Sequence, residues 1–220
     1  MDKVTTHRTT RGRHDVQRTN WQLLVVLGCS ALLLNGLASS PGIAGNATKQ
    51  KTATMQASSF GLRLANAALA RRWVPVIYNP AYVKIAYPGG DVPWYTGVCT
   101  DVVVRAYRSL GIDLQVEVHR ARVGSGDTNI DHRRVNVLRR FFARKGRALP
   151  ISKDPARYKP GDIVTMHLPE GQSSKTHIAI VTQHKSSAGV PLIIHNRGYG
   201  VQLEDWLFAR RITGHYRYKR

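Results

Sequence analysis

Residues 97–111 have the sequence GVCTDVVVRAYRSLG and contain the feature around which the rest of the chain can be understood. Apolar residues recur at positions 99, 102, 103, 106 and 110, which is the spacing of one face of an α-helix. Asp101 stands in the first turn, where a carboxylate complements the helix dipole, and Gly111 is typical of a helix end. Three consecutive valines favour a strand instead, but the spacing favours a helix, which we expect. Cys99 would then lie at a helix N-terminus, where free N–H groups lower the pKa of a thiol.

The length and composition of the chain allow one sizeable domain with an appendage. The chain has 220 residues, of which 42% are hydrophobic, enough for a core. The formal net charge is +20, and basic residues are scattered through the chain rather than confined to one tail. Such a charge indicates anionic surroundings, either a cell envelope or a nucleic acid, and says nothing about the fold.

The N-terminus has the pattern of an export signal. A basic segment at 1–20 precedes an apolar run from Trp21 to Ala38, and small residues with a proline follow. We expect residues 1–44 to be a signal peptide or an N-terminal membrane anchor, residues 45–57 a linker, and residues 58–220 the catalytic domain. The protein would be periplasmic or secreted, and membrane-anchored if the segment is not cleaved. Cys29 falls in this segment, which leaves Cys99 without a disulfide partner.

Helix-type patterns precede strand-type patterns in the remainder of the chain. A helix is expected at 60–73, with Phe60, Leu64, Ala67, Ala68 and Trp73 facing the core, and another at 135–145. Short β-type runs follow at 163–166, 176–183, 192–196 and 212–218. Helices first and strands afterwards predict an α+β domain with its sheet in the C-terminal half.

Two histidines in these β-type runs, together with Cys99, supply the residue types that a thiol hydrolase needs. His177 opens one predicted strand and His195 ends the next. A thiol nucleophile needs an imidazole that takes and returns a proton, and a third polar group that fixes the imidazole. Cys99, His177 and His195 supply these types in chain order, although a single buried cysteine is more often inert. No Cys-x-x-Cys or His-x-x-x-His spacing occurs, so we expect neither a metal site nor a cofactor.

Four blocks of the sequence resemble the NlpC-type cell-wall peptidases, which are papain-like cysteine peptidases. Residues 98–114 resemble the nucleophile helix of that family, and residues 159–164 resemble its Pro-Gly-Asp-Leu turn and strand. Residues 177–181 and 193–196 resemble its two histidine strands, and Tyr87 with the glycine pair after it lies where the family has a Tyr and a Gly-Gly pair. The Tyr87 segment and the ending at 212–218 also resemble, more closely, an exported bacterial domain of unknown function within that superfamily.

The resemblance implies a papain-like core in which the Cys99 helix packs against an antiparallel sheet that carries both histidines. Cys99 would be the nucleophile, His177 the general base and then acid, and His195 the group that orients His177. The Cys99 N–H would stabilise the oxyanion, together with the hydroxyl of Tyr87.

Two further residues are candidates for substrate contact, and the residues around the cysteine depart from the family pattern. Asp101 and Asn196 are the substrate candidates, although a helix-dipole role for Asp101 is an equal alternative. Val98 replaces the Asp that usually precedes the cysteine, and Thr100-Asp101 replaces Ser-Gly. The pocket around the scissile bond would therefore differ from that of the relatives.

The predicted function is cleavage of an amide bond in peptidoglycan stem peptides by a bacterial cysteine peptidase. Its expected partner is peptidoglycan or another anionic envelope polymer, with no nucleic acid, membrane contact only through the N-terminal segment, and a monomeric state. In one alternative the same site acts on another envelope amide or ester, or transfers an acyl group. In the other alternative the protein is non-catalytic and binds an anionic polymer or a nucleic acid.

Overall fold

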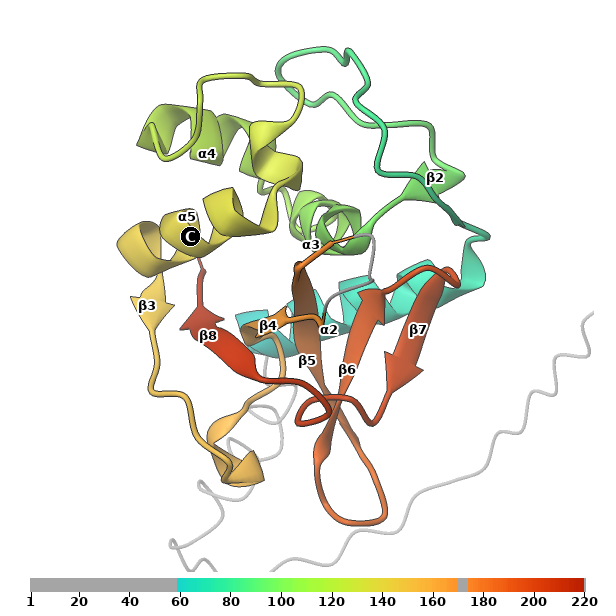
Figure 1. Ribbon diagram of the computed structural model, residues 1–220, viewed down its shortest axis with the longest axis vertical. Coiled ribbons are helices and arrows are strands. Elements are labelled where there is room, and N and C mark those ends of the chain that lie inside the picture. Colours follow the sequence, from blue (N-terminus) through green and yellow to red (C-terminus); the bar gives the residue numbers. More distant parts are fainter. Residues whose placement is uncertain (1–58, 170–173, 220) are drawn as a thin grey trace, which may run out of the picture. The chain divides into compact units, whose positions relative to one another are not determined.

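The computed structural model describes residues 59–169 and 174–219, which lie within one unit at 53–220 (Figure 1). The predicted signal or anchor at 1–44 and the linker at 45–57 lie outside the described residues and stay predictions. Within the described ranges, no helix is both long enough and apolar enough to cross a membrane.

Helices occupy the first half of the described chain and most strands the second. The helices are α2 (Phe60–Ala70), η1 (Arg71–Trp73), α3 (Cys99–Arg108), α4 (Leu114–Ala121), η2 (Asp131–Arg133), α5 (Val135–Lys145) and η3 (Pro155–Arg157), where η marks a 3-10 helix. The strands are β1 (Ile77–Tyr78), β2 (Thr96–Gly97), β3 (Arg147–Ala148), β4 (Ile163–His167), β5 (Thr176–Lys185), β6 (Pro191–Asn196), β7 (Val201–Glu204) and β8 (Ile212–Arg217). The predicted α+β class and the predicted strands at β4, β5, β6 and β8 are confirmed.

Six strands form an antiparallel sheet in the order β3-β8-β4-β5-β6-β7, and β1 and β2 form a separate parallel pair. Strands β4 to β7 are neighbours in sequence and in the sheet, whereas β8 returns to lie beside β4. The strands with His177 and His195 are therefore adjacent, and β7 lies beside the second of them.

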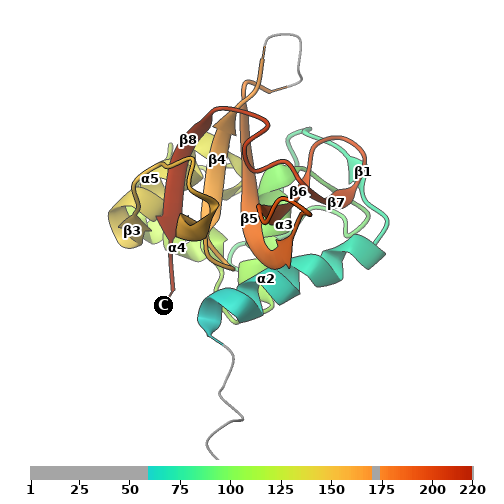
Figure 2. The ribbon, with the colours of Figure 1, turned by 90° about the horizontal axis from the view of Figure 1, so that it is seen from below.

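The sheet buries a separate apolar cluster on each face. Ile178, Ile180 and Ile194 pack with residues of α2, α3 and α5 on one face, which is the side on which Figures 1 and 2 show α2 and α3. Ala179, Val181 and Ile193 pack with Leu207 and other residues on the opposite face. Since successive strand side chains alternate between faces, His177 and His195 belong to this second face.

The apolar residues that were expected to face the core from the predicted helices do so, with one exception. In α2, Leu64 and Ala68 are fully buried, but Trp73 is 83% exposed. The chain leaves the α-helix at Ala70 and continues as the short η1 turn, which takes Trp73 off the buried face. The expectation that Trp73 joins the core is therefore wrong.

Candidate active site

Cys99 is the first residue of α3, as the apolar spacing predicted, so the alternative of a strand is wrong. The helix begins after Val98, whose N–H donates to Asp101 Oδ2 at 2.7 Å. It ends before Gly111, which has a φ of +77° and donates its N–H to the carbonyl of Arg108 at 2.9 Å. Nearly every residue of α3 is buried, which makes this helix the centre of the domain.

The thiol of Cys99 is buried at the junction between α3 and β5. Only 5% of Cys99 is exposed, and burial raises the pKa of its thiol to about 12. The backbone N–H of Ile178, the residue after His177, is the strongest influence that lowers this pKa, and the N–H groups of Thr100 and Cys99 act in the same direction. The expectation of a lowered thiol pKa is therefore wrong for this state, because desolvation outweighs the helix N-terminus.

The two histidines form a hydrogen-bonded pair. His177 Nε2 and His195 Nδ1 are 2.7 Å apart, and the ring centroids lie 4.9 Å apart in an edge-to-face arrangement. The rings are 2% and 0% exposed, and both pack against the indole of Trp206. Burial, followed by the charge of neighbouring groups, lowers the pKa of His177 to about 3, and burial lowers that of His195 as well.

Cys99 and His177 open on two pockets that share Tyr78. Cys99 lines a cleft of about 580 Å³ together with Tyr78, Val98 and other residues. His177 lines a smaller pocket of about 110 Å³ with Tyr78 and Trp206. No hydrogen bond joins the Cys99 thiol to the His177 ring in the part of the chain that the structure describes. Cys99 packs in the cluster on the α3 face of the sheet, whereas the His177 ring packs against Trp206 on the other face.

A glutamate that the sequence did not single out extends the histidine pair. Glu204 lies on β7, and its Oε2 is 2.6 Å from His195 Nε2. Arg197 donates two hydrogen bonds of 2.8 Å to the same carboxylate. These bonds from Arg197, and then that from His195, lower the pKa of Glu204 to about 2.

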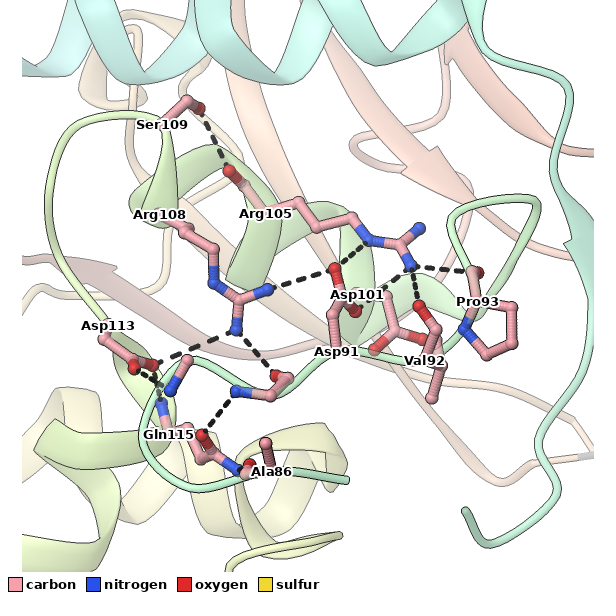
Figure 3. Close-up of polar contacts among 12 residues, drawn as sticks. Ala86, Asp91, Val92, Pro93, Asp101, Arg105, Arg108, Ser109, Asp113 and Gln115 are labelled. Atoms are coloured by element: carbon pink, nitrogen blue, oxygen red, sulfur yellow. Dashed lines mark hydrogen bonds and ion pairs between the residues drawn. The ribbon is translucent and has the colours of Figure 1, made fainter. Parts of the chain in front are cut away.

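The segment with Tyr87 is bound to the helices rather than to the cleft. Arg105 and Arg108 both contact Asp91, at 2.8 and 3.0 Å, and Arg108 also reaches the carbonyl of Gly90 (Figure 3). The Tyr87 ring packs edge-to-face on His119 of α4, and Tyr87 lines neither pocket. The structure thus does not place Tyr87 beside the Cys99 cleft, because these contacts hold its loop against α3 and α4.

A different tyrosine lies at the cleft, where the sequence predicted Tyr87. Tyr78, from the short strand β1, lines both the Cys99 cleft and the His177 pocket. The only local signal was an aromatic residue in a short extended segment before Asn79 and Pro80.

Asp101 and Asn196 hold the frame of the site and do not line its pockets. The Asp101 carboxylate is 2% exposed and pairs with Arg133 at 2.8 Å, besides accepting from Val98. The amide of Asn196 is fully buried, and its Nδ2 donates to the carbonyl of Gly97 at 3.3 Å. Asp101 thus supports the first turn of α3, and Asn196 ties β6 to the residues before Cys99; contact of either with substrate stays a prediction.

The cleft beside Cys99 is basic, and the described residues that line it include no acidic one. Arg134 and Arg140 line it and are exposed, whereas Arg133 lines it while paired with Asp101. Among the described residues, no group of three or more His, Cys, Asp and Glu side chains is arranged to hold a metal ion.

The fold and site define an α+β domain in which a cysteine at a helix start adjoins two histidine-bearing strands, as the resemblance implied. A family model described as "Domain of unknown function (DUF1287)" matches residues 65–218, and the chain belongs to this family. The chain is 43% identical over 173 residues to the uncharacterized protein YijF of Escherichia coli (strain K12), across 73% of this chain and 83% of that relative.

Two solved structures from Trichomonas vaginalis, of NlpC2 and NlpC1, are also similar. They share 20% and 18% sequence identity with this chain, with TM-scores of 0.44 and 0.41. Each comparison covers 72% of this chain, but 46% and 44% of the respective solved chains. This chain therefore spans less than half the length of either protein.

Proposed function

We propose that this protein is a thiol hydrolase that cleaves an amide bond with Cys99 as nucleophile, His177 as general base and acid, and His195 as the orienting group. The observation that carries the proposal is the joint placement of these residues. Cys99 begins a buried helix and lines a cleft, and it adjoins the strand on which His177 is hydrogen-bonded to His195 at 2.7 Å.

In the first half of the reaction, Cys99 Sγ attacks the carbonyl carbon of the amide while its proton passes to His177. A sulfur–carbon bond forms and the carbonyl electron pair moves to the oxygen, which gains negative charge. When this pair returns, the carbon–nitrogen bond breaks and His177 gives its proton to the leaving amine. The raised pKa of Cys99 and the lowered pKa of His177 keep the resting pair neutral, so proton transfer accompanies attack.

In the second half, His177 takes a proton from water and the oxygen of that water attacks the thioester carbon. The carbon–sulfur bond then breaks, the acid product leaves, and the proton held on His177 returns to Cys99. The Cys99 N–H is the donor proposed for the oxyanion in both halves, a role that contributes about 3–4 kcal/mol in comparable sites.

The proposed substrate is the stem peptide of peptidoglycan, and the proposed location is outside the cytoplasm. The resemblance of residues 87–196 to cell-wall peptidases and the export-type pattern at 1–44 support both proposals. The basic cleft supports them as well, because the exposed guanidinium groups of Arg134 and Arg140 would attract the carboxylates of such a peptide.

Mass spectrometry of muropeptides incubated with the wild type and with Cys99→Ala tests the proposal. The wild type should release a new amine and a new carboxylate at one peptide position, and Cys99→Ala should release neither. His177→Ala should also be inactive, whereas His184→Ala, which removes an exposed histidine from the same strand, should be as active as the wild type. If the wild type and Cys99→Ala give identical muropeptide products, the proposed hydrolase activity is contradicted. Binding to nucleic acid with a steep salt dependence and no hydrolysis would favour a polymer-binding protein.

A further inference from the structure

A carboxylate terminates the chain of hydrogen bonds that begins at the His177 ring. His177 Nε2 is 2.7 Å from His195 Nδ1, and His195 Nε2 is 2.6 Å from Glu204 Oε2. Both histidines are at most 2% exposed, whereas the Glu204 side chain is 26% exposed, so the histidine pair is shielded from water and only the carboxylate end of the chain reaches solvent. Arg197 fixes the carboxylate through two further bonds of 2.8 Å.

We propose that Glu204 is a positioning residue that fixes the tautomers of both histidines and leaves Nδ1 of His177 free to accept a proton from Cys99. An ionised carboxylate only accepts hydrogen bonds, so Nε2 of His195 must carry the hydrogen. In a neutral ring, Nδ1 of His195 is then an acceptor, which requires that Nε2 of His177 donates to it. His177 is thereby left with its lone pair on Nδ1. The inference rests on the roles proposed above for Cys99 and His177.

The charges around the rings agree with this assignment. The pKa of Glu204 is about 2, because Arg197 donates to it, and the carboxylate is therefore ionised near neutral pH. The pKa values of both histidines are lowered, first by burial, so the rings are neutral at the same pH. The charged groups that act on the two rings are Glu204, which favours the protonated form of each, and Arg197, which opposes it.

The strand register explains how one short strand supplies this carboxylate. His195 pairs with Gln202 across β6 and β7, so Glu204 is the diagonal neighbour of His195 on the same face of the sheet. Trp206 packs against both rings and lies under the guanidinium of Arg197. Glu204, Arg197 and Trp206 thus surround the histidine pair on the sheet face opposite α3.

Nitrogen NMR of the full chain with isotope-labelled histidine tests the tautomers directly. The signals are assigned from their loss in His177→Asn and His195→Asn. We expect both rings of the wild type to carry hydrogen on Nε2 near neutral pH. Glu204→Ala should mix the tautomers of His195, because its Nε2 loses the acceptor. Glu204→Gln keeps an acceptor oxygen and should retain the Nε2–H form. Asp205→Ala, which removes the adjacent exposed carboxylate, should leave both rings as in the wild type.

The rate of Cys99 alkylation by iodoacetamide, followed as a function of pH, gives a second readout that needs no substrate. Glu204→Ala should react more slowly than the wild type by about 10- to 100-fold near neutral pH, the equivalent of one hydrogen bond to a charged group. Asp205→Ala should follow the wild-type profile.

Two results would overturn the role of Glu204. One is hydrogen on Nδ1 of His195 in the wild type. The other is unchanged tautomers and alkylation in folded Glu204→Ala; if that variant does not fold, the wild-type tautomers alone decide the role. If the tautomers are fixed as expected but the protein hydrolyses no amide, the proposed hydrolase activity is overturned and the positioning role of Glu204 is retained.

Discussion

Replacement of Arg133 by methionine should destabilise the domain more than any loss of a surface charge, because it breaks a buried ion pair at the start of α3. Arg133 Nε and Nη2 donate to the two Asp101 oxygens at 2.8 and 3.0 Å, and each side chain is 2% exposed. Without the guanidinium, the Asp101 carboxylate stays buried, and among the described residues only the Val98 N–H still donates to it.

The structure sets the size of the effect. Removal of one partner from a buried ion pair costs about 3–5 kcal/mol, a large part of the about 5–15 kcal/mol that stabilises a typical domain. For a domain of this size the melting temperature should fall by about 6–20 °C. Asp101→Leu combined with Arg133→Met removes both charges and should recover most of the loss, except for about 1 kcal/mol from the unpaired Val98 N–H.

Urea unfolding followed by circular dichroism measures these differences. The matched control is Arg157→Met, because Arg157 pairs with Asp154 at 3.8 Å while their side chains are 62% and 53% exposed. This control should lose less than about 1 kcal/mol. A similarly small loss in Arg133→Met, or a double variant whose loss equals the sum of the single losses, would refute the reasoning.

Two further predictions concern acid and the buried carboxylate of Asp162. Burial lowers the pKa of His177 to about 3 and that of His132 to about 4, from 6.5. Since the unfolded chain binds these protons first, stability should fall as the pH drops from 6.5 towards 4, by up to about 1.4 kcal/mol per pH unit for each histidine. Urea midpoints at several pH values should fall less steeply for His177→Asn, and equal slopes would contradict this. Asp162 is fully buried and accepts hydrogen bonds from His215 and Arg217 at 2.6–2.8 Å. Asp162→Asn should lower the thermal midpoint by the equivalent of about 1.5–3 kcal/mol, the loss of hydrogen bonds to a charged group, against less than about 0.5 kcal/mol for the exposed Asp205→Asn; comparable shifts would show that the burial of Asp162 matters little.

The long elements of the fold were predictable because their apolar spacing is regular. The helix predicted at 135–145 coincides with α5, in which Leu138, Phe141 and Phe142 are fully buried. Strand β7 was missed because it has only four residues and two of them are polar. Glu204 was missed with it, because nothing nearby in sequence links this carboxylate to His195.

The position of Tyr87 was not predictable for a related reason. Tyr87 was chosen from its distance before Cys99 along the chain, but loop position depends on contacts with other elements. Asp91 accepts from Arg105 and Arg108 and draws this loop to α3, and the amide of Gln115 holds it from α4. The earlier residue Tyr78 lines the cleft instead.

The sequence by itself determined that a thiol stands at a helix start and that two histidines follow on strands, because local periodicity records which side of each element is buried. Only the tertiary structure decided the state of that thiol. Burial raises its pKa to about 12, where the sequence alone indicated a lowered value. The tertiary structure also decided which carboxylate meets His195, because the pairing of β6 with β7 brings Glu204 beside a residue nine positions earlier. Local pattern cannot encode either outcome, since desolvation and strand register arise only when distant parts of the chain pack together.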